Sequence, residues 1–163
     1  MKPQFVEMPI LSNDRLILRS VGFDEILSII EISVYNGKFA KNEEEAIHIL
    51  KQINADVANG ESFHWGIYLK EESELVGTCG YYRGFADNIG EIGYLLKISY
   101  RGLGIMTEAV KLIVDFGFDR LRLKKVVGYT SMTNPASIAV LKRVGFKKVR
   151  SHIVDLKSEL SHM

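Results

Sequence analysis

The spacing of apolar residues in the first part of the chain predicts one strand followed by two helices. Residues 15–19 are a short apolar run with charged ends, which is typical of a strand. Between residues 23 and 34 the apolar positions recur at helical spacing. A second helix is expected over 43–58, with Asn42 as its N-cap and Gly60 as its stop.

The middle of the chain changes to a two-residue period. Residues 63–69 alternate between apolar and polar or small side chains, which predicts a strand with two distinct faces. Short polar turns then lead into similar runs at 74–82 and 89–97. Three such runs in sequence predict an antiparallel meander.

The last part of the chain returns to alternating helices and strands. A long helix is expected over 104–120, a short strand over 125–129 and a helix over 136–144 that stops at a glycine. Residues 146–156 predict a final strand. The order of elements indicates an α/β (α+β) fold, with a mixed, mostly antiparallel central sheet and helices on its faces.

Length and charge narrow the class of protein. No repeat or linker divides the 163 residues, so one domain is expected over 1–163, with a core at about 12–156 and a short tail at 157–163. The net charge of +1 predicts no nucleic-acid or membrane partner. With no signal-like amino terminus and no apolar run near the ~20 residues of a membrane span, a cytoplasmic protein is expected.

The cysteine and the histidines predict neither a disulfide nor a metal site. Cys79 is the single cysteine, and its alternating surroundings favour a small buried strand residue over a nucleophile. The spacing of the histidines fits no metal-ligand pattern, so no metal is expected. They are His48, His64, His152 and His162.

The segment from Arg101 to Met106 has the strongest chemical pattern. Gly102 and Gly104 stand between a predicted strand and a predicted helix, where backbone N–H groups and the helix dipole favour a diphosphate. A plain loop is the alternative. Thr107 occupies the place of the third glycine of a dinucleotide fingerprint, and the Gly-Lys-Ser/Thr ending of a P-loop is absent.

This segment resembles the coenzyme-A pyrophosphate loop of the GNAT acetyltransferase superfamily, Gln/Arg-x-x-Gly-x-Gly/Ala. Arg101 and Gly104 match that pattern, while Met106 stands where a small residue is usual. The departure is compatible with phosphate binding through the Met106 amide. It puts in question how closely the helix start approaches the phosphate.

Flanking blocks extend the resemblance to roughly residues 12–154. Residues 91–96, 134–146 and 14–19 resemble the ribosomal-protein N-terminal (alanine/serine) acetyltransferase branch, in the same order. The resemblance implies a GNAT-like sheet with splayed fourth and fifth strands and about four helices. It also implies acetyl-CoA as co-substrate and direct attack by an amine in a ternary complex. The implied cofactor-binding residues are Leu95, Leu96, Arg101, Gly102, Gly104, Ile105, Met106, Asn134 and Ser137.

Individual roles follow from the resemblance, each beside a structural alternative. A backbone N–H of Leu95 or Leu96 is expected to meet the thioester, and Ser137 to protonate or hydrogen-bond the sulfur. Asn134 is expected to contact the pantetheine arm, although it also suits the N-cap of the next helix. Glu91 is the proposed general base, with Asp155 and His152 in reserve.

Three aromatic residues lie on strands that could line an acceptor groove, although an aromatic on a strand is usually core. They are Trp65, Tyr81 and Tyr82.

The carboxyl terminus departs from the family. GNAT domains end with a two-strand hairpin, yet only seven residues follow Leu156, which predicts an exposed edge on the last strand. A homodimer through that edge is one expectation, and a disordered tail is the alternative.

Two functions are consistent with the sequence. The first is an acetyl-CoA-dependent N-acetyltransferase acting on a protein N-terminus or a small-molecule amine, and the sequence does not choose between these acceptors. The second is a non-catalytic acyl-CoA-binding or regulatory module with the same fold.

Overall fold

A computed structural model gives the structure of the chain and describes residues 7–131, 133–148 and 153–158. One mixed sheet dominates it, in the strand order β1-β2-β5-β6-β7-β8-β10-β9. Its strands are β1 (Leu11–Ser12), β2 (Leu16–Arg19), β5 (Phe63–Leu69), β6 (Glu74–Tyr82), β7 (Ile89–Leu96), β8 (Lys125–Ser131), β9 (Phe146–Lys148) and β10 (Ile153–Ser158). A separate two-stranded ladder pairs β3 (Val34–Tyr35) with β4 (Lys38–Phe39).

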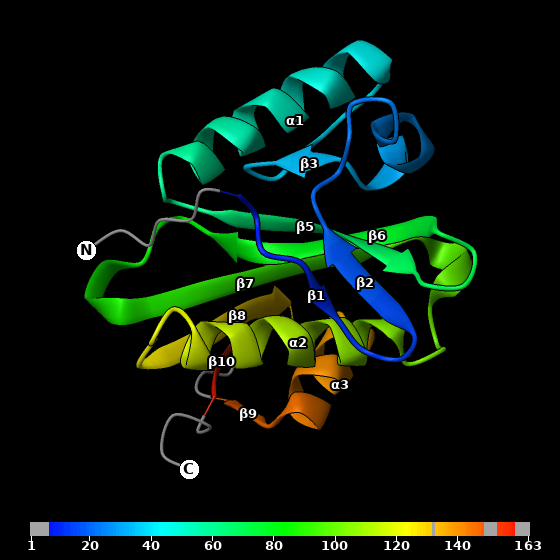
Figure 1. The fold of residues 1–163 in the computed structure, drawn as a ribbon. Helices are drawn as coiled ribbons and strands as arrows, with labels where there is room; N and C mark the ends of the chain where they lie inside the picture. Colours follow the sequence, from blue (N-terminus) through cyan, green and yellow to red (C-terminus); the bar gives the residue numbers. More distant parts are fainter. Residues whose placement is uncertain (1–6, 132, 149–152, 159–163) are drawn as a thin grey trace.

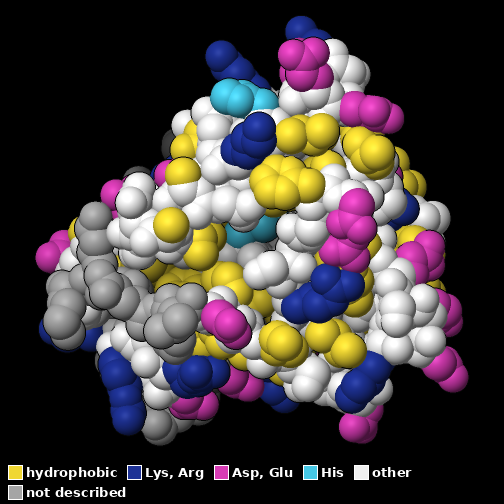
Figure 2. Space-filling model, turned by 45° about the horizontal axis from the view of Figure 1, so that its top comes forward, with side chains coloured by type: hydrophobic (Ala, Val, Ile, Leu, Met, Phe, Trp, Pro, Cys, Tyr) yellow, Lys and Arg dark blue, Asp and Glu magenta, His cyan; other side chains and the backbone are white. Residues whose placement is uncertain are grey.

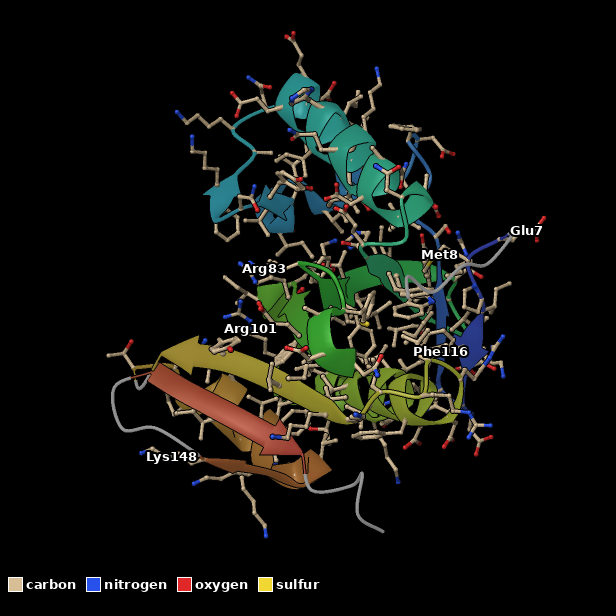
Figure 3. All side chains as sticks on the ribbon, turned by 90° about the vertical axis from the view of Figure 1, so that its left-hand side faces the viewer. Glu7, Met8, Arg83, Arg101, Phe116 and Lys148 are labelled. Carbon is tan, nitrogen blue, oxygen red and sulfur yellow. The ribbon has the colours of Figure 1, made fainter. Side chains whose placement is uncertain are left out.

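Helices cover both faces of the sheet (Figure 1). The α-helices are α1 (Glu43–Ala58), α2 (Ile105–Asp119) and α3 (Pro135–Val144), and the 3-10 helices are η1 (Ile26–Ile32), η2 (Ala86–Asn88) and η3 (Ile98–Tyr100). Figure 3 shows α1 on one side of the central strands and Phe116 of α2 on the other. Among the described residues, no helix is long and apolar enough to cross a membrane.

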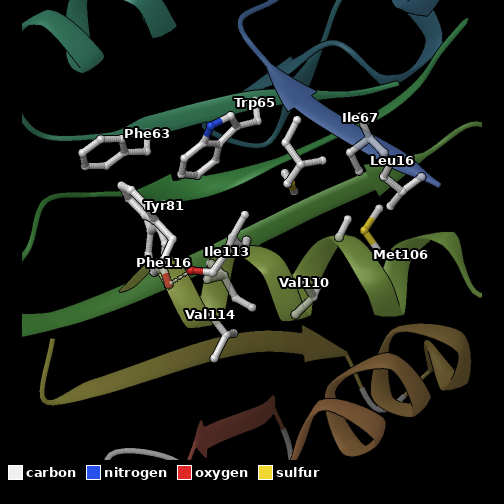
Figure 4. Close-up of a cluster of buried hydrophobic side chains, with 14 of the residues drawn as sticks. Leu16, Phe63, Trp65, Ile67, Tyr81, Met106, Val110, Ile113, Val114 and Phe116 are labelled. Carbon is white, nitrogen blue, oxygen red and sulfur yellow. Dashed lines mark hydrogen bonds between the residues drawn. The ribbon is translucent and has the colours of Figure 1, made fainter. Parts of the chain in front are cut away.

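The core has two parts, one on each face of the sheet. The larger part packs the apolar stripe of α2 against β2, β5 and β6, with Trp65 and Tyr81 fully buried (Figure 4). The Tyr81 hydroxyl donates a hydrogen bond of 2.6 Å to the carbonyl of Ile113. The smaller part packs η1 and α1 against the opposite face around Tyr68. Each face of the sheet therefore holds its own layer of helices.

The predicted meander and the helix over 43–58 are confirmed. β5, β6 and β7 pair antiparallel in sequence order. At the start of α1, the side chain of Asn42 accepts a hydrogen bond of 2.9 Å from the backbone N–H of Glu45, as an N-cap does. The acidic first turn of α1 further stabilises the helix through its dipole.

The fourth and fifth long strands separate along their length, as the resemblance implied. β7 and β8 pair in parallel from the beginning of each strand, and the last pair is Ile92 with Gly128. Beyond that point β7 continues to Leu96 and β8 to Ser131 without pairing to each other. The gap between them opens toward α2 and α3.

The helix predicted over 23–34 is wrong in type and extent. The structure has only η1 there, and Ile29 inside it leaves helical geometry with φ −130° and ψ 28°. Many of the residues are β-branched, and Ser28 bonds back to the carbonyl of Glu25. Glu25 itself accepts hydrogen bonds from Gly22 N–H and Tyr68. These local contacts replace a regular helical ladder.

The single final strand predicted over 146–156 is also wrong. β9 and β10 pair antiparallel, with Lys148 opposite Leu156 and Phe146 opposite Ser158, so the two-strand hairpin of the family is present. β10 reaches Ser158, which shortens the predicted tail. Since β9 covers β10, the exposed edge on which the dimer expectation rested is lost. His152 lies outside the described residues.

The buried Tyr81 hydroxyl gives a stability prediction. Replacing Tyr81 with Phe removes the bond to Ile113 inside the core, which should lower the free energy of unfolding by about 1 kcal/mol. The same replacement at the exposed Tyr129 should change it by less than about 0.5 kcal/mol. Urea unfolding followed by the fluorescence of Trp65 measures both. Equal effects at the two positions would contradict the assignment.

Candidate active site

One cavity lies where β7 and β8 separate. It has a volume of about 380 Å³ and is enclosed by the end of β7, the glycine loop, the first turn of α2 and α3. All nine residues predicted to bind the cofactor line it. The lining residues are Tyr94, Leu95, Leu96, Arg101, Gly102, Gly104, Ile105, Met106, Thr107, Asn134, Ala136, Ser137, Ala139, Val140 and Arg143. We call this cavity the cleft.

The glycine loop has the conformation that a phosphate site needs. Gly102 and Gly104 both have left-handed φ values, +80° and +79°, which residues with a Cβ rarely adopt. Gly104 is the N-cap of α2 and supplies no capping side chain. The N–H groups of the first turn are therefore left to a ligand. Arg15 supports the loop from outside, donating 2.9 Å to the carbonyl of Leu103 and pairing with Glu108.

Met106 does not block the approach of a phosphate. Its side chain is buried in the core and points toward Leu16 and Ile67 (Figure 4). Its backbone N–H remains in the first turn of α2, at the wall of the cleft. The Met106 side chain therefore packs in the core, although the family pattern has a small residue at this position.

Thr107 supplies an independent sign of a missing partner. Its hydroxyl Oγ1 is buried and has no hydrogen-bond partner among the described residues, although the residue lines the cleft. A buried hydroxyl without a partner destabilises the protein. A phosphate oxygen at the start of α2 would satisfy it. The residues present therefore fit a diphosphate at this position.

Backbone alternation decides which amides of β7 face the gap. The N–H of Lys97 donates to β6, and alternate residues of a strand point the same way, so the N–H of Leu95 also points to β6. Those of Tyr94 and Leu96 point into the gap toward β8. The carbonyl of Leu96 faces the same way and accepts a hydrogen bond of 3.3 Å from Nε of Arg101. Geometry thus favours Leu96 over Leu95 as a donor to a thioester.

Two hydroxyl groups meet across the gap. Ser137 Oγ and the Tyr94 hydroxyl are 2.8 Å apart, and Tyr94 also donates to the backbone carbonyl of Ser137 at 3.2 Å. Burial raises the pKa of Tyr94, so it stays a neutral donor. Asn134 caps α3, accepting from the N–H of Ser137 at 3.1 Å, as its structural alternative predicted. A role for Tyr94 was not predictable from the sequence, because a tyrosine on a strand has no distinguishing pattern.

The second cavity lies on the opposite face of the sheet, beneath η1 and α1. It also has a volume of about 380 Å³, and Figure 2 shows a hollow in this face with hydrophobic side chains inside it. Tyr94 and Leu95 line both cavities, so the two spaces meet at the end of β7. We call this second cavity the acceptor pocket.

Predicted residues divide between the acceptor pocket and the core. Glu91 lines the pocket and forms an ion pair with Arg83. Tyr82 lines it as well. Trp65 and Tyr81 belong instead to the core on the α2 face, so only one of the three predicted aromatic residues lines the pocket. The side chain of Asp155 is outside the described part of the structure, which leaves its reserve role untested.

His64 is a pocket residue that the sequence did not single out. It is 9% exposed, and its Nδ1 lies 2.7 Å from the Tyr82 hydroxyl. The Tyr82 side chain covers Gly80 and Gly93. An added Cβ would lie 2.8 Å from its hydroxyl oxygen at Gly80 and 3.1 Å from its ring at Gly93. Burial lowers the pKa of His64 from 6.5 to about 4, so the ring is neutral at pH 7.

The described residues offer neither an accessible cysteine nor a cluster of metal ligands. Cys79 is fully buried, as predicted, and burial raises the pKa of its thiol. Within the described ranges, no group of three or more His, Cys, Asp or Glu side chains could hold a metal ion. The functional groups in the two cavities include hydroxyl groups, backbone amides, the Glu91 carboxylate and the His64 imidazole.

The lowered pKa of His64 predicts acid sensitivity. Between pH 6.5 and 4 the unfolded chain binds a proton here that the folded chain does not, so stability falls as the pH falls. The loss attributable to this group should reach about 3 kcal/mol. His64→Gln should flatten the dependence of unfolding free energy on pH over this range, and the exposed His48→Gln should not. If the unfolding free energies of His64→Gln and of the wild type depended on pH in the same way, the effect of burial on His64 would be contradicted.

Known proteins share both the sequence pattern and the fold. Residues 15–147 match the acetyltransferase (GNAT) domain family. The chain is 29% identical over 148 residues to the uncharacterized N-acetyltransferase YoaA of Bacillus subtilis, covering 86% of the chain and 84% of YoaA. It is 38% identical over 91 residues to "Probable N-acetyltransferase YjcK" of the same organism, spanning 54% of the chain and half of YjcK.

Solved structures agree on the fold. The ribosomal-protein-S5-alanine acetyltransferase from Vibrio fischeri superposes with a TM-score of 0.73 at 20% identity, covering 91% of this chain and 94% of that one. The microcin C7 self-immunity acetyltransferase MccE, in complex with acetyl-CoA and AMP, gives a TM-score of 0.74 at 21% identity, covering 89% and 92%. With the family match over most of its length, the chain belongs to the GNAT acetyltransferase family.

Proposed function

We propose that the protein transfers the acetyl group of acetyl-CoA to a primary amine by direct attack in a ternary complex. The observation that carries the proposal is the meeting of the cleft and the acceptor pocket at Tyr94 and Leu95. Two substrates that enter from opposite faces of the sheet would meet there. Holding the two substrates together makes a bimolecular reaction effectively unimolecular, which lowers its entropic barrier.

The cleft would bind acetyl-CoA, which supplies the activated thioester. The N–H groups of Ile105 and Met106 and the hydroxyl of Thr107 would hold the pyrophosphate at the positive end of α2. The cation of Arg101 adds charge complementarity beside them. The complex of the structurally similar MccE with acetyl-CoA supports this choice of co-substrate.

In the transfer step, a C–N bond forms to the amine and the C–S bond of the thioester breaks. The N–H groups of Tyr94 and Leu96 that face the gap would stabilise the developing oxyanion. The departing thiolate needs a proton, and the hydroxyl pair of Ser137 and Tyr94 lies at that end of the cleft. Either hydroxyl can donate and be resupplied by the other.

The attacking amine must first lose its proton, because an α-amino group has a pKa of about 8 and a lysine amine about 10.4. Glu91 would accept this proton through a water molecule, since it lines the acceptor pocket on the strand that carries the oxyanion donors. The Arg83 ion pair holds the carboxylate in place.

Acetyl transfer itself is the direct test. Incubation of the protein with acetyl-CoA and a panel of primary amines should release free coenzyme-A thiol and yield amines heavier by one acetyl group. Thiol release measured with a chromogenic disulfide, and products measured by mass spectrometry, must agree. Tight binding of acetyl-CoA without turnover on any amine would support the non-catalytic module instead.

The orphaned hydroxyl of Thr107 gives a prediction for the cleft. Thr107→Val should raise the KM for acetyl-CoA about tenfold, because a phosphate contact is lost. The unfolding free energy of the unliganded protein should stay the same or rise, since an unpaired buried group is removed. Thr130→Val on β8, outside both cavities, is the matched control. An unchanged KM in Thr107→Val would remove this residue from the site.

The proton-acceptor role of Glu91 predicts a change in the pH profile. Glu91→Gln should lower kcat/KM by about a hundredfold at neutral pH, and the variant should regain rate as the pH approaches the pKa of the free amine. Glu71→Gln, in the turn between β5 and β6, should leave the profile unchanged. A Glu91→Gln profile parallel to that of the wild type would exclude Glu91 as the base.

A further inference from the structure

Two arginines stand at the ends of β2, and each forms an ion pair with a different part of the protein. Arg15, just before β2, pairs with Glu108 of α2 and donates to the carbonyl of Leu103 in the glycine loop. Arg19, the last residue of β2, pairs with Glu25, which immediately precedes η1. The first ion pair therefore adjoins the loop of the cleft, and the second adjoins a wall of the acceptor pocket.

Glu25 ties the start of η1 to two strands of the sheet. Its carboxylate accepts hydrogen bonds from the Gly22 N–H at 2.9 Å, from the Tyr68 hydroxyl at 2.9 Å and from the Arg19 guanidinium at 3.2 and 2.9 Å. The guanidinium also lies 3.7 Å from the centroid of the Tyr68 ring. Tyr68 is buried on β5, which pairs with β2. The hydrogen bond from Arg19 lowers the pKa of Glu25, so the carboxylate is charged at neutral pH.

η1 depends on contacts outside itself for its position. It has seven residues, its N-cap forms no side-chain capping bond, and Ile29 breaks the helical geometry. Hydrogen bonds within a short 3-10 segment have poor geometry and hold it weakly. On the inner side of η1, Ile26, Ile29 and Ile32 are buried and line the acceptor pocket, while Leu27 on the outer side is 44% exposed. A shift of η1 therefore changes the shape of the pocket.

The residues that fix η1 are not themselves part of the pocket wall. Arg19, Glu25 and Tyr68 do not line the acceptor pocket, whereas Ile26, which follows Glu25 directly, does. We infer that Arg19 and Glu25 are positioning residues for the amine acceptor, because they hold η1 where its isoleucines contact the apolar part of that molecule. The inference rests on the proposed function.

Separate KM values for the two substrates test the inference. Glu25→Ala removes all four hydrogen bonds, so η1 loses this attachment to β2 and β5. The KM for the amine should rise about tenfold. The KM for acetyl-CoA should change by less than about twofold, since the clefts's loop and helix share no contact with Glu25. Each KM is measured with the other substrate saturating.

A conservative variant separates the ion pair from the other contacts. Glu25→Gln keeps an acceptor oxygen for Gly22 and Tyr68 but loses the charge that pairs with Arg19. Its KM for the amine should lie between those of the wild type and Glu25→Ala, about threefold above the wild type. Amide hydrogen exchange should be faster in η1 of both variants and unchanged in α2. If Glu25→Ala does not fold, Glu25→Gln decides the test.

Two control variants lie on the other face of the sheet. Glu108→Gln weakens the ion pair with Arg15 beside the glycine loop, so it should raise the KM for acetyl-CoA and leave the KM for the amine unchanged. Tyr81→Phe removes a hydrogen bond from the core that α2 forms with the sheet. It lowers stability without touching η1 and should leave both KM values unchanged.

The outcomes are distinct. A wild-type KM for the amine in both Glu25 variants, or an equal rise in Tyr81→Phe, would overturn the inference while acetyl transfer stands. Equal increases of both KM values in Glu25→Ala would also overturn it, because the effect would then not be confined to the acceptor. If the wild type acetylates no primary amine although acetyl-CoA binds, the proposed function fails and the inference falls with it.

Discussion

The loss of pairing between β7 and β8 is the constraint on which the site depends. Backbone polar groups inside a protein need partners, and a sheet normally provides them between adjacent strands. Beyond the pair of Ile92 with Gly128, β7 and β8 no longer provide hydrogen-bond partners for each other. Arg101 satisfies one freed carbonyl, at Leu96, and the Tyr94–Ser137 contact bridges the opening. The remaining N–H groups face a cavity, which is how a break in secondary structure becomes a place for a ligand.

Much of the fold was predictable because its signals are local. The alternation at 63–69, the cap at Asn42 and the glycine at 145 each act within a few residues, and the structure has the expected element at each place. The helix predicted over 23–34 was wrong because hydrogen bonds from Gly22 and Tyr68 to Glu25 override the helical spacing of the apolar residues. The hairpin of β9 and β10 was not predicted, because the periodicity of residues along one segment does not show whether it pairs with another.

The candidate site divides in the same way. The glycine loop was predictable, since left-handed backbone positions just before a helix favour glycine. The Tyr94–Ser137 contact joins residues 43 apart, and that of His64 with Tyr82 joins residues 18 apart. No spacing rule connects such pairs.

The two core layers on opposite faces of the sheet have an evolutionary consequence. The layer of α2 fixes the loop and cleft, while the layer of η1 and α1 forms the walls of the acceptor pocket. Substitutions in groups that share no contacts have nearly additive effects on stability. Under the proposed function, new acceptor preferences can therefore arise through changes in η1 and α1 with little effect on the packing of α2 around the cleft.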